Sequence, residues 1–111
     1  MTLVLASREG PVARLTLNDP DHANVLSAPM MSELADALAA AAAAPEVRVI
    51  VLTAAGRIFC AGHDLEELTG GQGAPAPAAL FDQCAALMIA IGASRAPVIA
   101  RVQGAAVAAG C

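Results

Sequence analysis

Aromatic residues and lysine are the clearest absences from this chain of 111 residues. It contains no Trp, no Tyr and only two Phe, at positions 59 and 81. Its six basic residues are all arginines, spread singly along the sequence, and the formal net charge is -4. A core must therefore be built from aliphatic and small side chains. An acidic chain without a basic cluster is not expected to bind nucleic acid or an anionic membrane surface.

Paired cysteines and long uncharged apolar runs are missing too. Cys60, Cys84 and Cys111 are an odd number without metal-ligand spacing, so we expect free thiols and no metal site. The alanine-rich stretch 35–55 carries three charged residues and Pro45, so it is not expected to span a membrane. Neither a signal peptide nor a transit segment is evident at the N-terminus, and the cytoplasm is the expected compartment.

Hydrophobic residues make up 58% of the chain, which favours one small folded domain over disorder. Residues 3–5 and the alternating residues 12–17 predict a β-hairpin with one buried face. Ser27 is a suitable N-cap for a helix with Pro29 in its first turn, and this helix is expected to end near Pro45.

Two later segments have the composition of buried strands. Residues 47–53 are almost entirely apolar and β-branched, as expected for a strand covered on both faces, and residues 97–102 repeat the pattern. Each is followed by a loop of small residues. This recurrence predicts an α/β fold built from a repeated strand, loop and helix unit.

The segment between these strands is predicted to contain two helices. Asp64 followed by Glu67 has the spacing of a capping box, although Asp64, Glu66 and Glu67 could instead be read as an acid–base pair. The Gly- and Pro-rich segment 70–77 is either a mobile lid or a plain connector. An apolar stripe then predicts a longer helix ending near Ser94, with core residues Leu80, Cys84, Leu87, Met88 and Ile91. Met30 and Met31 are likewise expected in the core.

The two small-residue loops are the candidate sites of chemistry. Ligands of α/β proteins collect where strands end and helices begin. Glycine and alanine allow close backbone approach, so that peptide N–H groups can point at a ligand oxygen. Two such loops could converge on one oxygen and stabilise a developing oxyanion or enolate.

The residues of the first loop resemble a known family. Residues 57–65, Arg-Ile-Phe-Cys-Ala-Gly-His-Asp-Leu, look like the first signature of the crotonase superfamily, the enoyl-CoA hydratases and isomerases. Further similar blocks follow the family's order at residues 15–20, 24–27, 47–53, 97–104 and 108–111. The Ala-Ala-Gly-Cys ending resembles the enoyl-CoA hydratase domain-containing branch. The resemblance implies a crotonase-like (ClpP/crotonase) spiral of strand-strand-helix units.

The resemblance also implies a site. The backbone N–H groups of His63 and Ala109 would hold the oxygen of an acyl-CoA thioester as it becomes an enolate, without a metal or a cofactor. Residues implied in substrate and CoA binding are His22, Ala23, Ala61, Gly62, Asp64 and Leu65. His22 is the only cation at the Asn-x-Pro turn, where the family often places basic residues. Cys60 and Cys111 are expected to be small buried thiols rather than nucleophiles.

Family members are about twice as long or more, with C-terminal helices that build trimers or dimers of trimers. By this resemblance residues 1–111 are the N-terminal part of the spiral domain, and a catalytic glutamate would stand at position 112 with a second further on. We therefore expect an enzyme of fatty-acid metabolism whose 111 residues alone are inactive. Hydration, isomerisation and other enolate chemistry remain open, as does acyl-chain length.

Two functions other than that of an enzyme are also considered. A crotonase-like fragment or pseudoenzyme would act as a binding or interaction module. A plain nucleotide-binding unit is the least supported, because neither predicted buried strand is followed by a G-x-G-x-x-G run.

Overall fold

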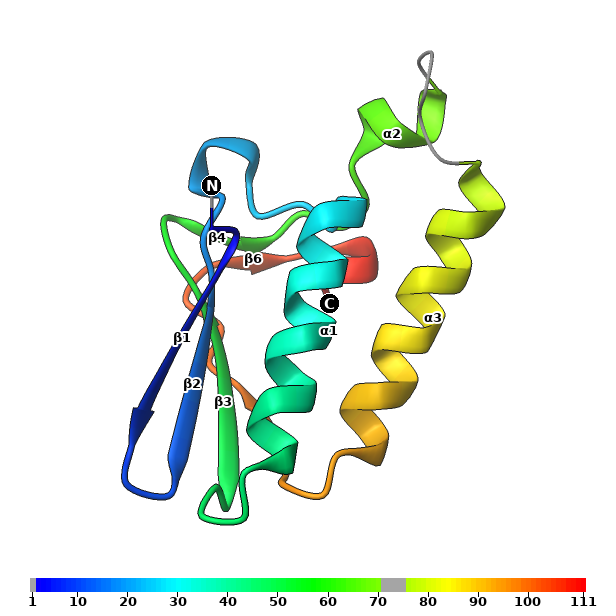
Figure 1. Cartoon of the computed structure of the whole chain (residues 1–111). Coiled ribbons are helices and arrows are strands. Elements are labelled where there is room, and N and C mark those ends of the chain that lie inside the picture. The colour runs from blue at the N-terminus through cyan, green and yellow to red at the C-terminus, as the bar shows by residue number, and fades with distance from the viewer. Residues whose placement is uncertain (1, 71–75) are drawn as a thin grey trace.

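The chain folds as three successive strand-strand-helix units (Figure 1). The computed structural model describes residues 2–70 and 76–111, so most of the predicted lid or connector lies outside the described residues. The first unit consists of β1 (Val4–Glu9), β2 (Val12–Leu17) and α1 (Ala28–Ala43). The second consists of β3 (Val49–Ala54), β4 (Ile58–Cys60), α2 (Leu65–Thr69) and α3 (Pro77–Ala93). The third consists of β5 (Val98–Ala100), β6 (Ala105–Ala106) and the 3-10 helix η2 (Ala108–Gly110).

The strands form two sheets that follow the repeat. The larger sheet has the order β1-β2-β3-β5, in which β1 and β2 form the predicted antiparallel hairpin and β2, β3 and β5 run parallel. The second strands of the later units, β4 and β6, pair in parallel as a separate sheet. Ile50 lies opposite Val98, so equivalent strands of the second and third units are neighbours, as the repeat predicted.

Helices α1 and α3 lie side by side over one face of the larger sheet (Figure 1). Helix α1 begins as predicted, with the Met30 N–H donating to the Ser27 hydroxyl at 3.2 Å. Met30 and Met31, both on this helix, are fully buried in the hydrophobic core, as expected. The core is thus aliphatic, and its largest buried side chains include Leu15, Leu17, Ile50 and Leu80.

The prediction that the parallel strands are buried on both faces was wrong. In β3, Ile50, Leu52 and Ala54 are buried, whereas the residues between them are only half-buried, because both long helices cover the same face. Strand β5 is at the sheet edge, and Ile99 is 54% exposed. Met88, expected in the core, is 42% exposed on α3. No helix within residues 2–70 and 76–111 combines the length and apolar content that crossing a membrane would require.

Candidate functional site

The turn between β2 and α1 is held by one buried amide. The 3-10 helix η1 (Pro20–His22) ends at Ala23 and Asn24, which both have left-handed backbone angles. The fully buried Asn24 side chain accepts from the Asp19 N–H at 2.7 Å. Its amide group donates to the carbonyls of Ala55 and Ile58, at 2.9 Å each. The turn is therefore fixed against the chain that leaves β3.

The loop after β4 is bound to this turn through its backbone. The Ala61 N–H donates to the Ala23 carbonyl at 3.1 Å, and the Leu26 N–H donates to the Gly62 carbonyl at 2.7 Å. Gly62 has φ of +93°, a conformation that glycine adopts without strain. Together these contacts fix the peptide that carries the His63 N–H.

The second small-residue loop, which leads into η2, lies directly against the loop after β4. The Val107 N–H donates to the Cys60 carbonyl at 3.1 Å. A Cβ at Gly62 would lie 3.1 Å from the Ala108 Cβ and 3.4 Å from the Ala109 nitrogen. In the described residues, neither the His63 N–H nor the Ala109 N–H donates to a protein acceptor, whereas the next amide, Gly110, bonds to the Val107 carbonyl. Two free donors thus come from adjacent loops.

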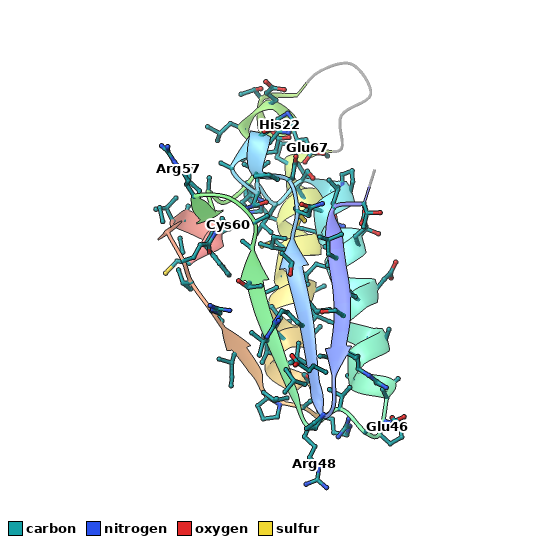
Figure 2. All side chains as sticks on the ribbon, turned by 90° about the vertical axis from the view of Figure 1, so that its left-hand side faces the viewer. His22, Glu46, Arg48, Arg57, Cys60 and Glu67 are labelled. Atoms are coloured by element: carbon teal, nitrogen blue, oxygen red, sulfur yellow. The ribbon has the colours of Figure 1, made fainter. Side chains whose placement is uncertain are left out.

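A cleft of about 630 Å³ opens at these loops. Five of the eight residues named from the sequence line it: His22, Ala61, His63, Asp64 and Leu65. Val25, Glu66, Leu68 and Ala108 complete the lining. Figure 2 shows His22 at this end of the molecule, opposite the end that carries Glu46 and Arg48.

The other three named residues lie beside the cleft rather than in its lining. Ala23 supplies the carbonyl that holds Ala61, and Gly62 supplies the close approach of the two loops. Ala109 lines a smaller apolar pocket of about 50 Å³, together with Cys60, Met88 and Ile91. A separate groove of about 220 Å³ between β1 and α1 is lined largely by alanines and contains none of these residues.

The acidic cluster at α2 does not form the predicted capping box. Asp64 is the N-cap, as expected, accepting from the Glu66 N–H at 3.0 Å. Glu67 instead accepts from the Ala28 N–H through both carboxylate oxygens, at 3.0 and 3.3 Å, and so caps α1. The acid–base pairing considered for this cluster is also unsupported by these contacts, because two of the three carboxylates are occupied by backbone N–H groups.

Two side chains near the cleft have shifted pKa values. The His22 imidazole lies 2.8 Å from the Asp19 carboxylate, and this hydrogen bond and charge raise the pKa of His22 above 6.5. Burial raises the pKa of the Cys60 thiol, partly offset by a hydrogen bond from the Gly62 N–H. Cys60 is thus a buried protonated thiol, as expected, but Cys111 is exposed, contrary to expectation.

Sequence reasoning assigned no individual role to two residues that shape the site, Asn24 and Phe81. Asn24 was noted only within a block of family resemblance, although an Asn tolerates the left-handed backbone found there. Phe81 lies on α3, and its ring packs edge-on to the His63 ring with centroids 5.1 Å apart. No sequence pattern connects residues 18 positions apart across a loop. Within the described ranges, no group of three or more metal-ligating side chains occurs.

Known proteins match this chain over nearly its whole length. The family model for enoyl-CoA hydratase/isomerase matches residues 7–111. Enoyl-CoA hydratase domain-containing protein 3, mitochondrial, of Danio rerio is 40% identical over 99% of the chain and 38% of the relative. The probable enoyl-CoA hydratase EchA14 of Mycobacterium tuberculosis is 42% identical over 96% of the chain and 41% of the relative.

A solved structure extends the match to the fold. The crystal structure of human enoyl Coenzyme A hydratase domain-containing protein 3 superimposes with a TM-score of 0.93 at 35% identity. It covers 99% of this chain and 44% of the solved one. The expected crotonase-like α/β fold and the resemblance to the domain-containing branch are confirmed. The chain spans about two fifths of the length of the curated relatives it matches.

The expected compartment is corrected by the same comparison. The enoyl-CoA hydratase domain-containing protein 3 relatives are named as mitochondrial proteins, which conflicts with a cytoplasmic assignment. That assignment rested only on the absence of a recognisable signal peptide or transit segment.

Proposed function

This chain belongs to the enoyl-CoA hydratase/isomerase family, and from that premise we propose that its cleft binds an acyl-CoA thioester whose oxygen accepts hydrogen bonds from the His63 and Ala109 amides. The observation that supports this proposal is the packing of Gly62 against Ala108 and Ala109, which places two unengaged N–H groups on touching loops. No side chain intervenes at Gly62.

Two fixed donors suit enolate chemistry. When a thioester loses a proton from its α carbon, or takes up a nucleophile at the β carbon, negative charge develops on the thioester oxygen. Donors already held in place stabilise that charge without reorganising, and one such donor contributes about 3 kcal/mol to the transition state. The hydrogen bonds of Ala61 and Leu26 supply the necessary rigidity on the His63 side.

The remaining named residues would hold the CoA portion and the acyl chain. His22 lines the cleft, and its raised pKa favours the cationic imidazole, which suits an anionic group such as a CoA phosphate. Leu65 and Ala61 present apolar surface, while Ala23, Gly62 and Asp64 shape the loops that carry them. In this proposal residues 1–111 are the enolate-holding part of a larger crotonase-like domain. Assembly of the complete parent enzyme into a trimer or a dimer of trimers stays a prediction, which analytical ultracentrifugation of that enzyme would check.

The oxyanion role is tested by NMR titration of the 111-residue chain. We expect butyryl-CoA to move the amide proton signals of His63 and Ala109 downfield, because both gain a carbonyl acceptor. The matched ligand is a thioether analogue with the same chain and no carbonyl, which should leave both amides nearly unmoved. Equal shifts with the two ligands, or none with butyryl-CoA, would exclude the assignment.

A binding module without turnover is the alternative function. Hydration needs one group to activate water and another to deliver a proton. Of the carboxylates lining the cleft, Asp64 caps α2, which leaves Glu66. We therefore expect the 111-residue chain to bind acyl-CoA without hydrating crotonyl-CoA. Turnover above background in a spectrophotometric assay would favour the enzyme over the module for this chain.

A further inference from the structure

The imidazole of His63 has no polar partner within the described residues. Its Nδ1 is buried and makes no hydrogen bond. Its Nε2 also makes no hydrogen bond to the described protein atoms, and the residue lines the cleft. The ring is positioned instead by Phe81, at 5.1 Å between centroids and an interplanar angle of 82°. A general base is usually oriented by a hydrogen bond to its second nitrogen, so this ring is not built as one.

The buried Nδ1 selects between the two neutral tautomers. If Nδ1 carried the proton, a buried N–H donor would be left without an acceptor, which is rarer and more costly than an unpaired lone pair. The form with the proton on Nε2 leaves only the lone pair of Nδ1 unpaired. His63 therefore presents an N–H donor toward the cleft.

The position of that donor limits what it can reach. Covalent geometry keeps Nε2 within about 5 Å of the backbone nitrogen of the same residue. If that backbone nitrogen holds the thioester oxygen, the ring reaches only the first few carbons of the acyl group. Phe81 is half-exposed on α3 and forms the support behind the ring.

We infer that His63 is a specificity-determining residue, whose Nε2–H donates to an acceptor oxygen on the acyl chain near its β carbon. The inference rests on the proposed function and deepens it. It assigns to the His63 side chain the discrimination between acyl-CoA thioesters that carry an oxygen near the β carbon, such as 3-hydroxyacyl thioesters, and thioesters with plain hydrocarbon chains. The backbone and the side chain of one residue then contact two different parts of the same ligand.

Binding measurements on the 111-residue chain test this assignment. We expect calorimetry to give a Kd for 3-hydroxybutyryl-CoA about fivefold lower than for butyryl-CoA, the effect of one hydrogen bond. His63→Phe keeps a flat ring without a donor and should abolish the preference. His63→Gln keeps an N–H at a similar distance from the backbone and should restore most of it. An identical ratio in all three proteins would overturn the inference.

Ring nitrogen NMR gives an independent readout that does not require the variants to fold. The free wild-type chain should show His63 protonated on Nε2, and 3-hydroxybutyryl-CoA should shift that nitrogen more than butyryl-CoA does. A proton on Nδ1, or equal shifts with both ligands, would refute the donor role. If the His63 and Ala109 amides respond but the ring does not, only this inference fails. If the amides do not respond either, the proposed function fails with it.

Discussion

Asn24 is the single residue that connects most of the site's backbone. Its side chain bonds to Asp19, Ala55 and Ile58, so it joins the turn before α1 to the chain on both sides of the loop between β3 and β4. A buried amide with three partners is costly to remove, because each former partner is left without a hydrogen bond. The precise placement of the His63 peptide depends on this side chain through Ala23 and Ala61.

Asn24→Ala is expected to lower the free energy of unfolding by about 3 kcal/mol, from the lost hydrogen bonds and the left-handed backbone that alanine tolerates poorly. Urea unfolding measures the change. The matched control is Asn18→Ala, whose solvent-exposed bond to the Thr2 carbonyl should be worth less than about 1 kcal/mol. A small effect at Asn24, similar to that at Asn18, would contradict the anchoring role.

The ion pair of His22 with Asp19 makes a pH-dependent contribution to stability. Because the folded-state pKa of His22 is raised above 6.5, the stabilisation is complete below pH 6.5 and is lost as the pH rises through the folded value. We expect NMR titration of the imidazole to give a pKa above 6.5 that returns toward 6.5 in Asp19→Asn. Asp21→Asn should shift it less, because Asp21 acts only through its charge and its effect is smaller than that of Asp19. An unchanged pKa in Asp19→Asn would exclude the pairing.

The helices are held at their ends by groups from distant segments. Glu67 of α2 caps the N-terminus of α1, and Gln83 of α3 donates to the carbonyl of the same residue, Ala28, at 3.1 Å. Figure 2 shows Glu67 and His22 at the same end of the molecule. The short helix that lines the cleft is thereby connected to the long helix that covers the sheet.

Arg95 caps the C-terminal end of α1. Its guanidinium donates to the carbonyls of Ala42, Ala44 and Val47, at 3.2, 2.9 and 2.8 Å. Arg95→Ala should lower the free energy of unfolding by about 2 kcal/mol, and Arg95→Lys should recover only part, since an ammonium cannot reproduce the planar fork.

Arg101→Ala is the control for Arg95, because its side chain makes no hydrogen bond within residues 2–70 and 76–111 and its loss should cost below about 0.5 kcal/mol. Chemical denaturation of the three variants provides the comparison. Full recovery by lysine would mean that net charge, not the fork of donors, stabilises this helix end.

For the molecule as a whole, the contact between the two small-residue loops determines how closely the second and third units approach. A Cβ at Gly110 would collide with the carbonyl group of Cys60, and one at Gly104 with that of Arg57. The second and third units can approach this closely only because these positions have no side chain. The same approach brings Ala109 to Gly62.

Gly110→Ala is expected to destabilise the fold by about 2 kcal/mol or more and to disturb the His63 and Ala109 amide signals together. Gly92→Ala is the matched control: it lies in α3 with open space around its Cα, so it should stabilise by about 0.5 to 1 kcal/mol. Thermal unfolding and an amide NMR spectrum check both. A neutral Gly110→Ala would show that the loops are not tightly packed.

Local chemistry explains which parts of this architecture the sequence predicts. Ser27 and Asp64 cap their helices because a cap depends on neighbours two or three residues away. The alternation in residues 12–17 and the repeat of apolar segments gave the hairpin and the parallel strands, and residues 57–65 indicated the family. The loops of His63 and Ala109 were identified for the same reason, from their small residues and their family resemblance.

Tertiary packing decided the rest, because those contacts join residues that are far apart in the chain. Glu67 accepts a hydrogen bond from the Ala28 N–H, 39 positions away in the sequence. Strand β4 pairs with β6, although neither short strand has a recognisable sequence pattern. The sequence could not foresee that both long helices cover one face and leave β5 at an edge. Nor could it place Phe81 against His63. Apolar periodicity specifies which side of a helix or strand is buried, but only the packing of the three units determines which residues that side contacts.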